Sequence, residues 1–368
     1  MKSILEKDLW SITSFLENKN YKFNKENILT QLPEKFIDEA IEAISSWDNY
    51  APTPLIKLNK LNEELKFKNI YYKDEDKRFE LKSFKALGGA FAVYKIASEK
   101  KNITVSTATA GNHGRSVAWG AQRLGLKCKI FISEFVSESR AEAMRNLDAE
   151  VIRVKGNYDN SLKECIEQSN KNNWEIVQDV SWEGYKEVPK LIMAGYTIMV
   201  KEIIDEINKN SITHVFLQAG VGGMAAAMIA GFAKLSKTIP QFIIIEPENA
   251  DCVFQSIKNN KPTTVDIKKE TVMGGMSCGD VSSIAWEILK NSANYCLTIP
   301  DEAISTTVAL LAEKHLSDEK IIAGECAVPG IIALIGSFNN KEYLDKLELN
   351  KQSNVLLFGC EGLTDNAM

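Results

Sequence analysis

Lys85 is the residue whose type and surroundings first suggest chemistry, since apolar side chains flank it in Ser83-Phe-Lys-Ala-Leu-Gly-Gly89. Burying an ammonium group without a partner is costly. A protein usually avoids this cost in one of three ways. The ammonium group forms a salt bridge, the aliphatic part of the side chain extends along the surface so that the ammonium group reaches solvent, or a lowered pKa leaves the amine neutral and nucleophilic. Taken alone, the segment favours the simpler interpretation, a surface lysine on an amphipathic helix.

A second segment, Thr107-Ala-Thr-Ala-Gly-Asn-His-Gly-Arg115, follows a predicted strand and opens a predicted helix. Its small residues and glycines expose backbone N–H groups at a positive helix end, which can receive a carboxylate or phosphate. Asn112 adds a side chain that can donate or accept a hydrogen bond. A plain capping turn explains the pattern equally well.

A third segment, Gln218-Ala-Gly-Val-Gly-Gly-Met-Ala225, also joins a predicted strand to a predicted helix. Its glycines allow the backbone to approach an anion closely. The same residues fit the dinucleotide fingerprint G-x-G-x-x-A, and Glu246 ends the next predicted strand. A nicotinamide-dependent oxidoreductase is therefore an alternative from a different reaction class.

Together the three segments meet the needs of pyridoxal 5'-phosphate. Its aldehyde needs an amine, its ring hydroxyl needs a hydrogen-bonding side chain, and its phosphate needs backbone N–H groups. The oxidoreductase alternative explains only the third segment.

The elements that must hold these residues alternate along the chain. Strands are predicted over 70–73, 103–106, 129–132, 150–154, 214–218, 242–246 and 354–358, and helices over 84–97, 111–124, 138–147 and 223–235. The first fifty residues are expected to form helices that pack on this body. Such alternation predicts an α/β protein with parallel sheets covered on both faces.

The length of 368 residues suggests two domains. The net charge of -5 gives no support for nucleic-acid binding. Seven scattered cysteines and three distant histidines form no metal-site or disulfide pattern. The first eight residues include acids where a signal peptide would be apolar, so we expect a cytoplasmic protein. The lysine-rich segments 66–73 and 95–101 are expected to be solvated.

The sequence resembles the fold-type II pyridoxal phosphate enzymes, which include threonine dehydratase and the tryptophan synthase β-chain, and among them the diaminopropionate ammonia-lyases. The resemblance runs from about residue 50 to the C-terminus. It is carried by the three segments above together with 72–79, Gln178-Asp-Val-Ser-Trp-Glu-Gly-Tyr185, 276–286 and Glu361-Gly-Leu-Thr-Asp365.

The resemblance implies two α/β lobes, each a sheet covered by helices, with the cofactor between them. The large cofactor-binding domain would comprise residues 1–89 and 191–368, and a small mobile domain residues 90–190. It also implies that the protein is a homodimer and that its substrate is a small amino acid.

The resemblance further assigns roles to individual residues. Lys85 would bind the cofactor covalently and shuttle the α-proton, and Phe84 would lie against its ring. Asn112 would contact the ring hydroxyl, and Cys360 would face the pyridine nitrogen unless it is simply a buried structural cysteine. The phosphate would be bound by Gly220, Val221, Gly222 and Gly223, and the substrate carboxylate by Thr109, Ala110, Gly111, His113 and Gly114.

Ammonia-lyases of this type carry an acidic proton acceptor where this sequence has Ala110. The expected activity is therefore α,β-elimination of 2,3-diaminopropionate to pyruvate and ammonia with the L-isomer preferred. Asp179 would bind or protonate the leaving amine, unless it is a helix cap. A serine/threonine-type dehydratase, or elimination from another β-substituted amino acid, is the alternative within the same chemistry. Cys252 and Cys278 lie where the family can carry a disulfide, although free thiols are expected in a reducing cytosol.

Overall fold

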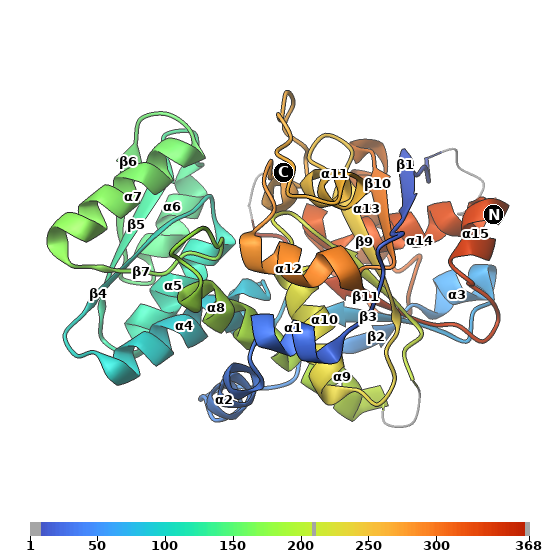
Figure 1. Cartoon of the computed structure of the whole chain (residues 1–368), viewed down its shortest axis with the longest axis horizontal. Helices are drawn as coiled ribbons and strands as arrows, with labels where there is room; N and C mark the ends of the chain where they lie inside the picture. The colour runs from blue at the N-terminus through green and yellow to red at the C-terminus, as the bar shows by residue number, and fades with distance from the viewer. Residues whose placement is uncertain (1–8, 208–210, 365–368) are drawn as a thin grey trace. The chain divides into compact units, whose positions relative to one another are not determined.

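The computed structural model describes residues 9–207 and 211–364, which form two compact units. Among these residues, the first unit comprises 9–33, 52–76 and 199–363, and the second comprises 34–51, 77–198 and Thr364. The two sheets, one in each unit, can be followed in Figure 1. The domains predicted from the sequence, residues 1–89 with 191–368 and residues 90–190, stay a prediction. The same holds for the mobility of the smaller domain. Residues 1–8, on which the expectation about a signal peptide depends, and Asp365 lie outside the described residues.

The sheet of the first unit has seven strands in the order β1-β10-β9-β8-β11-β3-β2. The five central strands are parallel, as predicted, but β1 pairs antiparallel with β10 and β2 pairs antiparallel with β3. The sequence prediction of parallel sheets therefore holds for these five strands but is wrong for β1 and β2, and the first fifty residues contribute a strand besides helices. The bounds are β1 Ser14–Glu17, β2 Leu55–Lys57, β3 Asn69–Asp74, β8 His214–Gln218, β9 Gln241–Pro247, β10 Tyr295–Ile299 and β11 Asn354–Gly359.

Helices pack on this sheet, and two of them, α10 and α14, are apolar and buried along nearly their whole length. A helix that is apolar all round needs cover on every side, which explains why further helices pack over α10. The bounds are α1 Lys25–Gln31, α3 Asn59–Leu65, α9 Ile198–Ile207, α10 Gly223–Leu235, α11 Cys252–Asn259, α12 Ser283–Ser292, α13 Ile304–Ala312, α14 Pro329–Asn339 and α15 Lys341–Lys346.

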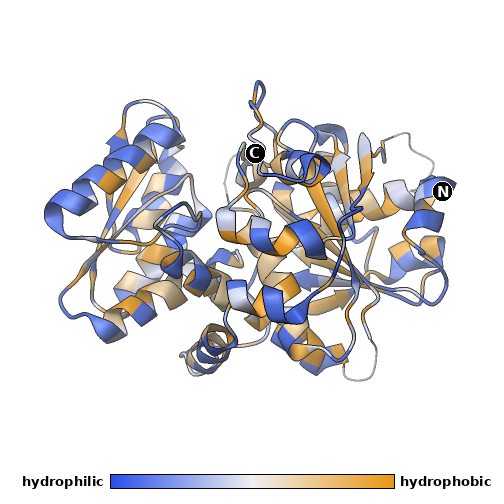
Figure 2. Ribbon diagram, in the orientation of Figure 1, coloured by the Kyte–Doolittle hydropathy of each residue, from blue (hydrophilic) through white to orange (hydrophobic). Residues whose placement is uncertain are grey.

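The second unit has a four-stranded parallel sheet in the order β6-β5-β4-β7. Helices α5 and α7 pack on its strands, and α4 packs on α5 and α8. Figure 2 shows α7 as mainly hydrophilic, as expected for a helix with one face in solvent. The strands are β4 Thr104–Ala108, β5 Lys127–Ser133, β6 Glu150–Val154 and β7 Glu175–Ile176, and the helices are α2 Glu34–Ser45, α4 Lys85–Glu99, α5 Asn112–Arg123, α6 Glu138–Arg145, α7 Tyr158–Asn172 and α8 Glu187–Tyr196.

A glycine sets the close approach of α4 to α8. A Cβ atom on Gly88 would lie 2.5 Å from the Ile192 carbonyl oxygen and 2.5 Å from the Tyr196 ring. We expect Gly88→Ala to lower the free energy of unfolding by about 1–3 kcal/mol, since backbone must shift to admit the methyl group. Gly274→Ala, where a Cβ would meet nothing within 4 Å, is the control. Urea denaturation measures both, and equal stability of the two variants would contradict the packing described.

Lys73 and Glu202 form an ion pair inside the first unit. The Lys73 Nζ lies 2.6 Å from Glu202 Oε2, and both side chains are buried. The same Nζ donates to the Thr53 carbonyl oxygen at 2.6 Å. The expectation that residues 66–73 form a solvated lysine-rich face is therefore wrong for Lys73. No helix among the described residues is long and apolar enough to cross a membrane.

Candidate active site

Lys85 begins α4, and its ammonium group forms an ion pair with Asp179 Oδ2. The two side chains are 27% and 14% exposed, so the pair lies largely out of solvent. Of the interpretations open at the sequence level, the salt bridge is the one that the structure adopts. The Lys85 Nζ also lies 5.5 Å from the centre of the Phe84 ring.

Ser116 on α5 fixes the backbone that carries Lys85. Its hydroxyl donates to the Lys85 carbonyl oxygen at 2.5 Å and accepts from the Ala90 N–H at 3.1 Å. A Cβ on Gly89 would lie 2.4 Å from the same hydroxyl oxygen, so a glycine is needed here. Ser116 could not be predicted from the sequence, because a single serine within a helix gives no signal of a contact 31 residues away.

The turn before α5 is organised by its own threonine. The Thr109 hydroxyl oxygen accepts from the N–H groups of Gly111 at 3.0 Å and of Gly114 at 3.2 Å. Ala110 is exposed at the tip of the turn, and Asn112 is half-buried as the first residue of α5. The turn thus has a fixed shape, and the Thr109 hydroxyl serves the turn itself.

The His113 imidazole points into the protein, towards Asp179. Its Nε2 lies 2.8 Å from the Val177 carbonyl oxygen, and its Nδ1 lies 3.7 Å from Asp179 Oδ2. This Nδ1 is buried and has no hydrogen-bond partner among the described residues. Burial lowers the pKa of His113, as does the positive charge of Lys85, whereas Asp179 acts in the opposite direction.

Asp179 is held in its ionised form. Burial acts to raise its pKa, but the positive charges of His113, when its imidazole is protonated, and of Lys85 outweigh that effect and lower the pKa well below the usual value of an aspartate. The preceding residue, Gln178, fastens the segment to β4, since its Oε1 accepts from the Thr107 hydroxyl at 2.8 Å. Asp179 is therefore a carboxylate whose negative charge faces a lysine.

Tyr196 completes this cluster from α8. Its ring packs edge-on against Phe84 with 4.7 Å between ring centres, and its hydroxyl is buried beside the Lys85 amine. Burial raises the pKa of Tyr196. Tyr196 could not be predicted from the sequence, because an isolated tyrosine in an apolar helix looks like any other residue of the hydrophobic core.

The glycine segment of the first unit forms a tight loop between β8 and α10. Gly222 has a φ of 86°, a left-handed conformation that favours glycine. A Cβ on Gly220 would lie 3.0 Å from Cys278 Sγ and 3.0 Å from the Gly275 carbonyl oxygen. Gly223 begins α10, a helix of 13 residues whose positive end faces this loop.

Comparison with known proteins reveals the family of this chain. A family model described as pyridoxal-phosphate dependent enzyme matches residues 47–360. The diaminopropionate ammonia-lyase of Escherichia coli (strain K12) is 35% identical over 340 residues, which cover 86% of this chain and 85% of that protein. The chain belongs to the pyridoxal-phosphate dependent enzymes.

Solved structures agree with this membership. The crystal structure of diaminopropionate ammonia lyase from Escherichia coli in complex with D-serine superposes with a TM-score of 0.89 at 31% identity, covering 97% of this chain and 96% of that one. Threonine deaminase isoform 2 from Solanum lycopersicum superposes with a TM-score of 0.80 at 21% identity, covering 97% and 90%, a likeness of fold alone. The predicted α/β fold of a fold-type II pyridoxal phosphate enzyme is confirmed.

The residues present fit the cofactor of this pyridoxal-phosphate dependent enzyme. A tight glycine loop at the start of α10 offers backbone N–H groups of the kind that phosphate prefers. Cys360 follows β11 and is buried, with its thiol donating to the Cys326 carbonyl oxygen at 3.2 Å. Lys85 supplies the amine that the aldehyde requires.

Glu246 argues against the nicotinamide alternative. Its carboxylate is fully buried and accepts from the N–H groups of Val253 at 2.8 Å and Phe254 at 2.6 Å. Burial raises the pKa of Glu246 well above its usual range. A carboxylate enclosed at the start of α11 is not available to a ribose hydroxyl.

Cys252 and Cys278 are not joined by a disulfide in the structure. Both lie close to the glycine loop, since the Cys252 Sγ is 3.5 Å from the Gly220 carbonyl oxygen and the Cys278 Sγ bounds the space beside Gly220.

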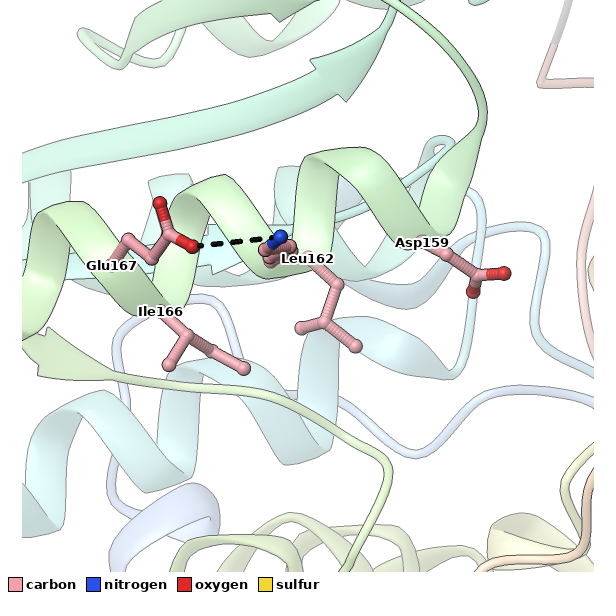
Figure 3. Close-up of a pocket in the computed structure, with 5 residues that line it drawn as sticks. Asp159, Leu162, Ile166 and Glu167 are labelled. Carbon is pink, nitrogen blue, oxygen red and sulfur yellow. Dashed lines mark ion pairs between the residues drawn. The ribbon is translucent and has the colours of Figure 1, made fainter.

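Figure 3 shows a hollow elsewhere on the second unit, along the outer side of α7. It contains none of the predicted site residues, and an ion pair of 3.9 Å joins Lys163 to Glu167 across it. An open hollow on one helix offers no enclosed polar groups for a substrate. Its lining residues are Asp159, Leu162, Lys163, Ile166 and Glu167.

Proposed function

We propose that the chain catalyses the α,β-elimination of 2,3-diaminopropionate to pyruvate and ammonia, with Lys85 as its central catalytic residue. The likeness to diaminopropionate ammonia-lyase over 86% of the chain supports the reaction. The single observation that supports the residue is the Lys85–Asp179 ion pair, which places an amine and an acid at one point.

Each predicted site residue has a proposed partner on the cofactor or substrate. When bound, pyridoxal 5'-phosphate withdraws electrons from the α-carbon of an amino acid. Lys85 would hold the aldehyde carbon, and Phe84 would pack beside the ring. Asn112 would donate to the ring hydroxyl, and Cys360 would be the partner of the pyridine nitrogen. Gly220, Val221, Gly222 and Gly223 would bind the phosphate.

Lys85 also takes the α-proton. A lysine acts as a base only with a free lone pair, so it must first release a proton and leave Asp179. Asp179, whose side chain Lys85 touches, then faces the leaving nitrogen and passes to it the proton that Lys85 has released. The substrate carboxylate is bound at the turn by backbone N–H groups within Thr109, Ala110, Gly111, His113 and Gly114.

Ala110 makes the choice of isomer testable. Removing a proton from the opposite face of the α-carbon requires a second base, and alanine has none. We expect the L-isomer to react preferentially, and Ala110→Asp to raise turnover of the D-isomer by about 10²-fold. Ala110 is exposed, so the new carboxylate carries little folding cost. Ala110→Asn is the control, since it has similar size and no base.

Pyruvate and 2-oxobutyrate released from L- and D-diaminopropionate, serine and threonine test the function. Equal rates on both isomers in the unaltered chain would contradict the assigned preference. Turnover of hydroxy amino acids only would favour the serine/threonine-type dehydratase instead. Homodimeric assembly and a cytoplasmic location are further proposals, supported by the resemblance to the family.

A further inference from the structure

We propose that His113 stores, on its Nδ1 atom, the proton that Lys85 releases, and returns it through Asp179 to the leaving nitrogen. The proposal rests on the proposed function for the last of these steps. The His113 imidazole acts through Asp179 and does not itself contact the substrate, so its role in this step is a positioning role. Its imidazole then has a role separate from the carboxylate-binding turn to which it belongs.

The hydrogen bond to Val177 decides which nitrogen of His113 carries hydrogen. A carbonyl oxygen can only accept, so Nε2, at 2.8 Å from it, must be the donor. In the neutral imidazole Nδ1 then has a lone pair and no hydrogen. It faces Asp179 Oδ2, another acceptor, at 3.7 Å. Two acceptors do not attract each other, which agrees with Nδ1 having no partner among the described residues.

Lys85 keeps this arrangement stable. Its ammonium group pairs with the same Oδ2 atom of Asp179 that Nδ1 of His113 faces. The carboxylate charge is thus compensated without a proton on the imidazole. Burial and the Lys85 charge both lower the pKa of His113, so the resting imidazole is neutral.

Once Lys85 loses its proton, it no longer compensates the negative charge of Asp179. To bind an aldehyde or take the α-proton, the amine must first lose a proton and expose its lone pair. Asp179 then has no cation beside it, and a buried carboxylate without a counterion is costly. A proton on His113 Nδ1 restores the pair. The net charge of the three groups is unchanged, so no external acid is needed.

The return step also balances. As the bond between the β-carbon and nitrogen breaks, its electron pair stays on the nitrogen. That nitrogen takes a proton from Asp179, which receives one from His113. Lys85 takes the α-proton and becomes an ammonium group again. All three groups end as they began.

The neighbouring titratable groups do not compete for this proton. Tyr185 and Tyr196 are the further groups of the second unit whose pKa values Asp179 influences. Burial raises the pKa of both tyrosines well above that of a free phenol, so both stay protonated.

Histidine NMR tests the proposal without any assay of turnover, because the chain has three histidines. The full chain is labelled at histidine Cε1, freed of cofactor and titrated, and a His113→Gln spectrum assigns the signal. We expect Lys85→Gln to raise the pKa of His113 by about one pH unit or more, because a cation is lost from its counterion. Asp179→Asn should lower it. His214, also buried, and the exposed His315 are internal controls that should not move.

An unchanged His113 pKa in folded Lys85→Gln protein would overturn the proposal. If Lys85→Gln does not fold, the Asp179→Asn variant tests the proposal alone. The proposal requires the pKa of His113 to be lower in Asp179→Asn than in the unaltered chain. In the holoenzyme, His113→Gln keeps a donor for the Val177 carbonyl but cannot store a proton. We expect kcat to fall about 10- to 100-fold with KM unchanged. The NMR titration contains no substrate. It therefore tests the coupling of His113 to Lys85 and Asp179 even if diaminopropionate is not the substrate.

Discussion

Replacing Lys85 with alanine should reduce ammonia release by about 10⁴-fold or more. The loss is expected to be this large because one amine both binds the cofactor and takes the α-proton. Borohydride reduction followed by peptide mass spectrometry should find a pyridoxyl label on Lys85 in the unaltered protein and none in the variant.

Lys95→Ala is the matched control for this change. Lys95 lies on the same helix, α4, and pairs with Glu39 at 2.9 Å, away from Asp179. It should keep activity within about twofold, since a half-exposed ion pair contributes little. Normal turnover by Lys85→Ala, or a label on a different lysine, would refute the assignment of Lys85.

Asp179→Asn should lower kcat by about 10²–10⁴-fold, the usual range for a lost acid or base. An amide has a similar shape but cannot deliver a proton to a leaving nitrogen. Glu183→Gln is the control, since Glu183 is an exposed carboxylate four residues further along the chain. Steady-state kinetics on L-diaminopropionate compares the two, and a variant as active as the control would rule Asp179 out as the acid.

The same substitution should also change how stability depends on pH. The pKa of Asp179 is lowered in the folded protein, so the folded state favours the ionised form more than the unfolded chain does. This contribution is fully present above the unfolded pKa of about 3.9 and is lost as pH falls towards the lowered value. Urea midpoints measured as the pH falls from about 4 to about 2 should therefore decrease less for Asp179→Asn than for the unaltered chain.

The sequence predicted several strands and helices well, because their hydrophobic runs and glycine boundaries are local. The predicted 150–154, 214–218 and 223–235 match β6, β8 and α10 residue for residue. The edge strands β1 and β2 could not be predicted in the same way. Their direction depends on pairing with β10 and β3, and in β1 the partner residues lie more than 270 positions away.

The site was predictable where chemistry lies in a short motif, and unpredictable where it depends on contacts across the chain. Lys85 and the glycine loop stand out in the sequence itself. The Lys85–Asp179 pair joins residues 94 positions apart, and neither residue type alone reveals it. The burial of Lys73 has the same cause, since its partner Glu202 lies on α9, far along the sequence.

The place of β11 in the large sheet has a consequence for biosynthesis. This strand, the last of the sheet in chain order, ends at Gly359, yet it lies between β8 and β3 inside the sheet. A ribosome must therefore synthesise the chain as far as β11 before β3 can meet its parallel neighbour. The four-stranded sheet is complete by Ile176 and can form while translation continues. Until β11 emerges, β3 and β8 present unpaired backbone edges, the kind of surface that chaperones shield during synthesis.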